Sequence, residues 1–267
     1  MTMTETPAGI AATPWYRPLD REVELFQLCV QERLPLLLKG PTGCGKSRFV
    51  AHMAARLDRP LITVACHDDT TATDLLGRYL VRDHDTVWCD GPVTRAVRRG
   101  AILYLDEIAE ARPDVVVAVH PLTDHRRELY LDRCDEVVTA APGFMLVASF
   151  NPFYQKGLKE LKPSTRQRFV SLAFGYPPAV VEAEILMGET GIDKARAKKL
   201  VTLAGKLRHA EMLGLAEVPS TRLLVDAARL MKAGFPERIA CRAAVVESVS
   251  DDPETVTAMN DILSLFF

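Results

Sequence analysis

The chain has 267 residues, of which 48% are hydrophobic and 25% are charged, and its formal net charge at pH 7 is −2. These values are ordinary for a globular protein and leave room for one large domain or two small ones. A net charge so close to zero provides no basic field for nucleic acid, and no hydrophobic run approaches the ~18–20 residues of a membrane-spanning helix. We therefore expect no nucleic-acid partner and no membrane partner.

The N-terminal segment and the cysteines indicate in which cellular compartment the protein is expected. Residues 1–18 are small, polar and proline-containing, which predicts a flexible arm and not a signal peptide. The six cysteines lie far apart and form no C-x-x-C pair, a usage typical of reduced thiols in the cytosol. The sequence therefore predicts a cytoplasmic protein.

The most informative stretch is a glycine-rich turn between a predicted strand at 34–38 and a predicted helix at 48–57. The turn matches the G-x-x-x-x-G-K-[ST] pattern and reads Gly40-Pro41-Thr42-Gly43-Cys44-Gly45-Lys46-Ser47. In this context the glycines let backbone N–H groups cradle phosphate oxygens, and the helix start adds its positive dipole. Lys46 is expected to reach the β- and γ-phosphates, and the Ser47 hydroxyl to bind Mg²⁺.

A second informative run, at 101–107, predicts a strand buried on both faces of a parallel sheet. It ends in Asp106 and Glu107, at the carboxyl edge where α/β sheets bind ligands. Asp106 is expected to hold Mg²⁺ through water, and Glu107 to orient and deprotonate the attacking water. The sequence has no Asn-Lys-x-Asp element for reading guanine, so ATP is the expected nucleotide.

Weaker candidates follow later in the chain. A hydrophobic strand at 144–150 ends at Asn151, whose amide can contact a γ-phosphate and align the water, although Asn-Pro is also a plain strand stop. Arg166 and Arg168 precede a strand at 171–174, and each is either a solvated charge or a finger that reaches a neighbouring subunit's nucleotide. Arg222, near the start of a predicted helix, is a surface charge or a phosphate contact.

The order of the predicted elements separates an α/β part from a helical part. A helix at 22–33 and a strand at 61–66 flank the phosphate-loop unit, and a further helix is predicted at 113–123. Short hairpins are expected at 79–88 and near 126–131. After Tyr176-Pro177-Pro178 the strands give way to helical patterns at 180–190, 194–213, 220–232, 236–248 and 253–267. We therefore predict a three-layer αβα phosphate-loop domain over residues 1–178 and a small helical lid domain over residues 179–267.

This order of motifs resembles the AAA+ ATPases over nearly the whole chain. Features similar to the MoxR branch are the two hairpins, Asp90-Gly91-Pro92 and the ending Arg168-Phe169; the stretches 74–77 and 100–108 resemble the CbbQ/NorQ group. Within that group the chain is identified as a CbbQ-type member, which implies the ATPase subunit of a Rubisco activase.

The resemblance also implies roles for particular residues. Gly40 to Ser47 match Walker A and Asp106-Glu107 match Walker B. Asn151 matches sensor 1, Arg168 the arginine finger and Arg222 sensor 2. Gln167 stands where the family often has aspartate before Arg-Phe, which leaves Arg166 as a competitor for the finger.

The activity implied by the resemblance is that of a ring. A homohexamer is expected to bind ATP and Mg²⁺ between its two domains and to complete each site with an arginine from the next subunit. Hydrolysis would move the hairpins and, with a von Willebrand factor A-domain adaptor, release inhibitory sugar phosphates from Rubisco. The alternatives are NorQ-like activation of nitric oxide reductase, a monomeric P-loop kinase and an inactive ATP-binding scaffold.

Overall fold

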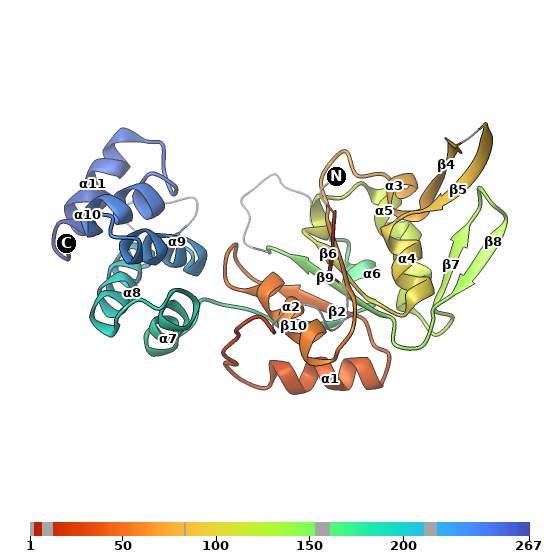
Figure 1. Cartoon of the computed structure of the whole chain (residues 1–267), viewed down its shortest axis with the longest axis horizontal. Helices are drawn as coiled ribbons and strands as arrows, with labels where there is room; N and C mark the ends of the chain where they lie inside the picture. The colour runs from red at the N-terminus through yellow and green to blue at the C-terminus, as the bar shows by residue number, and fades with distance from the viewer. Residues whose placement is uncertain (1–2, 7–12, 83, 153–160, 211–217) are drawn as a thin grey trace. The chain divides into compact units, whose positions relative to one another are not determined.

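Figure 1 shows the computed structural model of the chain, which describes residues 3–6, 13–82, 84–152, 161–210 and 218–267. Contacts divide the chain into two compact units. The first comprises Met1–Pro14, Asp20–Gly40 and Lys46–Ala173, and the second comprises Trp15–Leu19, Pro41–Gly45 and Phe174–Phe267. The second unit thus contains the C-terminal helices together with part of the phosphate loop.

The first unit is built on a six-stranded sheet with the strand order β1-β3-β6-β9-β2-β10. All neighbouring strands are parallel except β1, which is antiparallel to β3 at the edge. Strands that run parallel end at the same edge of a sheet, so the residues after β2, β6 and β9 come close together. The strands are Met3–Thr6 (β1), Leu36–Lys39 (β2), Leu61–Ala65 (β3), Ile102–Asp106 (β6), Met145–Phe150 (β9) and Val170–Ala173 (β10).

Strand β1 corrects the prediction of a flexible arm. Met3–Thr6 pairs with Leu61–Val64 of β3, so these residues belong to the sheet. The physical reason is that the edge of β3 offers unpaired backbone N–H and C=O groups, which an extended segment can satisfy. Residues 7–12 of the predicted arm lie outside the described residues, and residues 13–19 have no regular secondary structure.

The helices of the first unit follow local signals at their ends. Thr71 and Asp74 form a capping box at the start of α3, and α4 begins with Pro92 and ends at Gly100 with a backbone φ of +66°. The helices are Glu22–Gln31 (α1), Lys46–Arg56 (α2), Ala72–Leu76 (α3), Pro92–Arg99 (α4), Pro113–Val119 (α5) and Pro163–Arg166 (α6), with 3₁₀ turns at Ile108–Glu110 (η1) and His120–Thr123 (η2). The helix predicted at 113–123 thus changes to a 3₁₀ turn at His120, because Pro121 has no N–H to continue it.

Two antiparallel hairpins project from this unit on the side of α4 (Figure 1). The first pairs Gly77–Arg82 (β4) with Asp85–Asp90 (β5), which confirms the hairpin predicted at 79–88. The second pairs Glu128–Leu131 (β7) with Glu136–Thr139 (β8), and the arm predicted near 126–131 is its first strand.

Strand β6 lies in the hydrophobic core of the first unit. Its residues Ile102–Leu105 are at most 1% exposed. Leu103 pairs with Ile62 of β3 on one side and with Leu146 of β9 on the other. A strand that is hydrophobic on both faces is stable only where both faces are covered, as expected for a parallel sheet with helices on its faces.

The second unit contains the helical C-terminal part of the chain, with its own hydrophobic core. Its helices are Ala179–Thr190 (α7), Lys194–Arg208 (α8), Thr221–Lys232 (α9), Glu237–Cys241 (α10) and Pro253–Leu263 (α11), with a π-helical turn at Arg242–Val246. Helix α8 ends at Arg208, earlier than the predicted end at 213, and residues 211–217 lie outside the described residues. Over the part of the chain that the structure describes, no helix is both long and apolar enough to cross a membrane.

Truncation of Leu103 tests the placement of β6. Leu103→Ala is expected to lower the free energy of unfolding by about 2–5 kcal/mol, because the side chain is fully buried and its removal leaves a cavity. Val117→Ala is the matched control: Val117 is 62% exposed on α5, and its truncation should cost about 0.5 kcal/mol or less. The midpoint of urea denaturation, followed by circular dichroism, checks both variants. Equal losses of unfolding free energy in the two variants would contradict the placement of Leu103 in the core.

Candidate active site

The phosphate loop joins the end of β2 to the start of α2. Gly43 and Gly45 have backbone φ angles of +68° and +104°, in the left-handed region that favours glycine because it has no Cβ. The N–H of Gly40 donates to the Phe150 carbonyl at 3.3 Å. The ammonium of Lys46 is buried and donates to the Gly40 carbonyl at 2.8 Å. The start of the loop is therefore held at the edge of the sheet where β9 ends.

Asp106, the last residue of β6, is the centre of a network of hydroxyl groups. Its Oδ2 accepts a hydrogen bond from Ser47 Oγ at 3.1 Å, and its Oδ1 accepts from Ser149 Oγ at 2.5 Å and from the Tyr104 hydroxyl at 2.7 Å. The Tyr104 oxygen also lies 3.2 Å from Ser47 Oγ and 3.1 Å from Ser149 Oγ. The structure thus brings together Ser47 and Asp106, the two predicted metal ligands.

Tyr104 and Ser149 are not among the residues predicted from the sequence. Each is a polar residue inside a hydrophobic strand, two positions before a predicted site residue, Asp106 or Asn151. Side chains two positions apart in a strand share a face, and this spacing is the signal that could have found them. Burial, followed by the charge of Asp106, raises the pKa of the Tyr104 phenol, so the hydroxyl stays neutral and can donate.

Glu107 lies in the turn between β6 and η1. Its backbone has φ +56° and ψ +46°, and its N–H donates to Ser149 Oγ at 3.2 Å. A left-handed conformation is uncommon for a residue other than glycine and often occurs at functional sites. The turn holds Glu107, which is exposed, directly beyond Asp106.

Asn151 is the first residue after β9 and is half-buried. Strands β9 and β6 are paired, with Ala148 opposite Leu105, so Asn151 and Asp106 lie at the same edge of the sheet. The structure therefore places Asn151 at the end of the strand beside the one that carries Asp106.

Arg166 and Arg168 lie at the end of α6 and just beyond it, and both are exposed. The guanidinium of Arg168 is 4.0 Å from the Asp124 carboxylate, which also pairs with Arg126 at 2.6 Å. The hydrogen bond from Arg126 lowers the pKa of Asp124 to about 2, so this carboxylate is ionised at neutral pH. Arg126 therefore shares this carboxylate with Arg168, and the sequence indicated only a hairpin arm there.

In the second unit, Arg222 is the second residue of α9 and is exposed. This unit also contains Gly43 of the phosphate loop. A Cβ atom added at Gly43 would lie 2.5 Å from Ser220 Oγ and 3.3 Å from the Arg222 Cβ. The start of α9 therefore lies against Gly43, and no side chain larger than that of glycine fits between them.

Comparison with known families decides what this arrangement is. The profile described as AAA domain (dynein-related subfamily) matches residues 35–169, and the profile described as CbbQ/NirQ/NorQ C-terminal matches residues 182–266. The chain belongs to the CbbQ/NirQ/NorQ family of AAA+ ATPases. This confirms the predicted group and its activity as an ATP hydrolase.

Relatives in this family are similar over almost their whole length. NirQ of Pseudomonas aeruginosa, a denitrification regulatory protein, is 58% identical and aligns with 95% of this chain and 98% of its own. NorQ of Paracoccus denitrificans is 55% identical and aligns with 97% of this chain and 96% of its own. CbbQ of Hydrogenophilus thermoluteolus is 50% identical over 97% of each chain. Because these identities are similar, the narrower prediction of a CbbQ-type member is not singled out.

Solved structures support the fold. Two variants of RuvB from Thermotoga maritima match 91% of this chain and 69% and 67% of their own, with TM-scores of 0.55 and 0.53. Their sequence identities of 16% and 15% show the likeness of the fold alone. The predicted fold class of an AAA+ phosphate-loop domain with a helical C-terminal region is confirmed.

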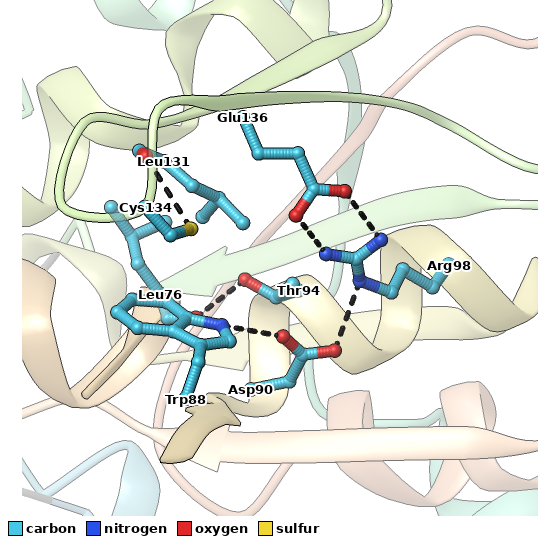
Figure 2. Close-up of polar contacts among 8 residues, drawn as sticks. All are labelled: Leu76, Trp88, Asp90, Thr94, Arg98, Leu131, Cys134 and Glu136. Carbon is cyan, nitrogen blue, oxygen red and sulfur yellow. Dashed lines mark hydrogen bonds and ion pairs between the residues drawn. The ribbon is translucent and has the colours of Figure 1, made fainter. Parts of the chain in front are cut away.

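In this member of the CbbQ/NirQ/NorQ family, Arg98 of α4 bridges the two hairpins (Figure 2). Its Nε lies 3.0 Å from an oxygen of Asp90 at the end of β5. Its two terminal nitrogens donate to both carboxylate oxygens of Glu136 in β8, at 2.7 and 2.5 Å. The indole N–H of Trp88 donates to the other oxygen of Asp90 at 2.8 Å. One helix residue thus connects β5 to β8.

Tyr79 of β4 adds a second link between the hairpins. Its ring packs edge-to-face on Trp88 with the centroids 5.2 Å apart, and its hydroxyl donates to the Arg133 carbonyl at 3.3 Å. Arg133 lies between β7 and β8. The two hairpins therefore contact each other directly, in addition to their contacts with α4.

Loss of the Arg98 bridge is expected to loosen the second hairpin without unfolding the unit. The Arg98 side chain is 36% exposed, and pairs with this exposure contribute about 1 kcal/mol or less to stability. Arg98→Met should therefore speed amide hydrogen exchange over Glu136–Thr139 about two- to fivefold, as measured by mass spectrometry. Arg99→Met is the matched control, because Arg99 lies on the same helix but pairs with Glu5 of β1. Equal effects of the two variants would contradict the bridge.

Proposed function

We propose that this chain binds ATP with Mg²⁺ and hydrolyses it at the site around residues 40–47, 106 and 107. The observation that carries the proposal is the hydroxyl network in which Ser47 of α2 and Asp106 of β6 lie 3.1 Å apart. A phosphate loop and a carboxylate at that separation can hold the same phosphate-bound cation. Membership in a family of ATP hydrolases supports the same chemistry.

Binding is assigned to the phosphate loop. The backbone N–H groups from Gly40 to Ser47 would receive the phosphate oxygens, and Lys46 would offset the charge on the β- and γ-phosphates. The hydroxyl of Ser47 and the carboxylate of Asp106 are oxygen donors of the kind that Mg²⁺ prefers, so the residues fit this ion. When bound there, Mg²⁺ supplies positive charge against the phosphate oxygens.

Hydrolysis is assigned to Glu107 and Asn151. The Glu107 carboxylate would accept a proton from water as the water oxygen bonds to the γ-phosphorus and the bond to the ADP oxygen breaks. The Asn151 amide would donate a hydrogen bond that aligns the γ-phosphate with this water. The left-handed turn at Glu107 supports the assignment, because it holds an exposed carboxylate at the end of the strand that carries Asp106.

Assembly into a homohexamer belongs to the same proposal. Arg168 would reach the nucleotide of the neighbouring subunit, with Arg166 as the competitor for this role, and Arg222 would contact the phosphates from its own chain. Head-to-tail contacts that close on themselves generate rings, so activity would depend on assembly. In this proposal the nucleotide-binding domain comprises residues 1–178 and the helical lid domain residues 179–267. The proposed location of the protein is the cytoplasm.

We infer further that hydrolysis drives the remodelling of a partner enzyme together with a von Willebrand factor A-domain adaptor. Rubisco is the client that the resemblance to CbbQ favours, with release of inhibitory sugar phosphates. Nitric oxide reductase is a second candidate, because the 58% identical relative is named a denitrification regulatory protein. The proposed contact surface is the first hairpin, where Tyr79, Val81 and Val87 are 47%, 77% and 44% exposed.

Removing the proposed base should separate ATP binding from turnover. Glu107→Gln is expected to lower kcat about 10²–10⁴-fold with ATP affinity retained, because the amide cannot accept the proton. Phosphate release and a binding titration measure the two quantities. Glu110→Gln, three residues further on, is the control and should leave turnover near that of the unmodified protein. Undiminished turnover in Glu107→Gln would remove Glu107 from the mechanism.

The same variant identifies the client. Glu107→Gln loaded with ATP is expected to retain its partners when it is recovered from its native cytosol, because the bound state persists. Mass spectrometry of the recovered proteins reads the result. An A-domain protein with Rubisco supports the first client, and one with reductase subunits supports the second. Recovery of neither client at any ATP concentration would contradict the remodelling proposal.

Tyr104 provides a test of the network itself. Tyr104→Phe is expected to raise the Mg²⁺ concentration needed for half-maximal ATP turnover about 10- to 100-fold, because the Asp106 carboxylate loses a donor that orients it. A titration of turnover against Mg²⁺ measures the shift. Tyr130→Phe is the control, since Tyr130 lies in β7 and its hydroxyl bonds to Glu128. An unchanged Mg²⁺ dependence in Tyr104→Phe would show that the hydroxyl is structural.

A further inference from the structure

The second unit contains a buried ion pair that the proposed reaction does not use. Glu182, in the first turn of α7, is fully buried, and Arg208 is the last residue of α8, with a side chain 12% exposed. The two terminal nitrogens of Arg208 donate to the two carboxylate oxygens of Glu182, both at 2.8 Å. Two parallel hydrogen bonds of this kind fix the distance and the angle between the groups.

Further contacts connect this pair to the start of α9. The Thr221 hydroxyl donates to Glu182 Oε1 at 2.6 Å, and Arg208 Nε donates to the Pro219 carbonyl at 2.8 Å. The Arg208 guanidinium also lies over the ring of Tyr176, 4.2 Å from its centre. Pro219 and Thr221 flank Ser220, the residue directly before α9. The ion pair therefore holds this helix start from both sides.

Stability alone is a poor explanation for such a pair. Removing two charges from water costs free energy that their attraction barely offsets, and hydrophobic residues of equal volume often stabilise a core as well. A buried and fully hydrogen-bonded pair does restrict geometry, because few arrangements satisfy all its donors and acceptors. The pair at Glu182 and Arg208 is therefore better explained by what it positions.

The segment that it positions lies against Gly43 within the same unit. Gly43 belongs to this unit, and a Cβ there would lie 2.5 Å from Ser220 Oγ and 3.3 Å from the Cβ of Arg222. Arg222 follows Thr221 directly, so the hydroxyl bond from Thr221 to Glu182 fixes the backbone from which Arg222 extends. A small rotation of α9 would move Arg222 relative to the loop.

We propose that Glu182, Arg208 and Thr221 are positioning residues that set Arg222 against the phosphate loop and so contribute to nucleotide affinity. This inference rests on the proposed role of Arg222 as a phosphate contact. It adds that the contact depends on a buried carboxylate in α7 and on the end of α8, neither of which touches the nucleotide.

A double-mutant cycle on nucleotide affinity tests the proposal. Thr221→Val removes the hydroxyl with almost no change of volume, and it is expected to weaken the binding of a fluorescent, non-hydrolysable ATP analogue about two- to tenfold. In a chain that already carries Arg222→Ala, Thr221→Val should weaken binding no further, because it acts through Arg222. Thr221→Ser keeps the hydroxyl and should restore affinity.

A variant of another threonine provides the control for this experiment. Thr202→Val removes a hydroxyl that bonds within α8, to the Lys198 carbonyl, and should leave affinity unchanged. Two outcomes would contradict the positioning role while leaving the role of Arg222 in place, provided that Arg222→Ala itself weakens binding. In the first, Thr221→Val weakens binding equally in the chain that keeps Arg222 and in the chain that carries Arg222→Ala. In the second, Thr221→Val does not weaken binding at all. If Arg222→Ala binds the analogue as tightly as the unmodified chain, the proposed role of Arg222 fails and this inference fails with it.

Discussion

The candidate site depends on the burial of β6 between β3 and β9. This strand is hydrophobic on both faces, so it is stable only at the centre of a covered parallel sheet, and parallel neighbours end at one edge. That edge collects Asp106 at the end of β6, Glu107 directly after it, Asn151 directly after β9 and the start of the phosphate loop after β2. The chemistry proposed for the chain therefore follows from strand order, because residues far apart in sequence become neighbours only there.

The polar residues inside these strands fix the orientation of the groups that the strand order brings together. A buried hydroxyl must find a hydrogen-bond partner, and Tyr104 and Ser149 find theirs at Asp106. Ser149 also accepts a hydrogen bond from the N–H of Glu107, so one serine of β9 contacts both Asp106 and Glu107. Such a network holds the Asp106 carboxylate in one orientation, which is what the metal site proposed there would require.

Two arginine bridges in this chain illustrate different uses of an ion pair. Arg98 is partly exposed, so its bonds to Asp90 and Glu136 are screened by water and contribute little to the stability of the fold. Arg208 is almost buried against Glu182, where losing one partner would leave an unpaired charge. The first pair can break and re-form at little cost in free energy, whereas the second restricts the arrangement of the residues that it joins.

The sequence by itself determined the phosphate loop, the strand before Glu107, the first hairpin, one strand of the second hairpin and the CbbQ/NirQ/NorQ group. The sequence encodes each of these in a continuous pattern of residue types. It did not determine the pairing of Met3–Thr6 with β3, the hydroxyl network of Tyr104, or the contacts of Arg208, which only the tertiary structure decided. The physical reason is that local patterns report the period of burial along one segment. A hydrogen bond between distant segments depends on the position of both, and no single stretch of sequence contains that information.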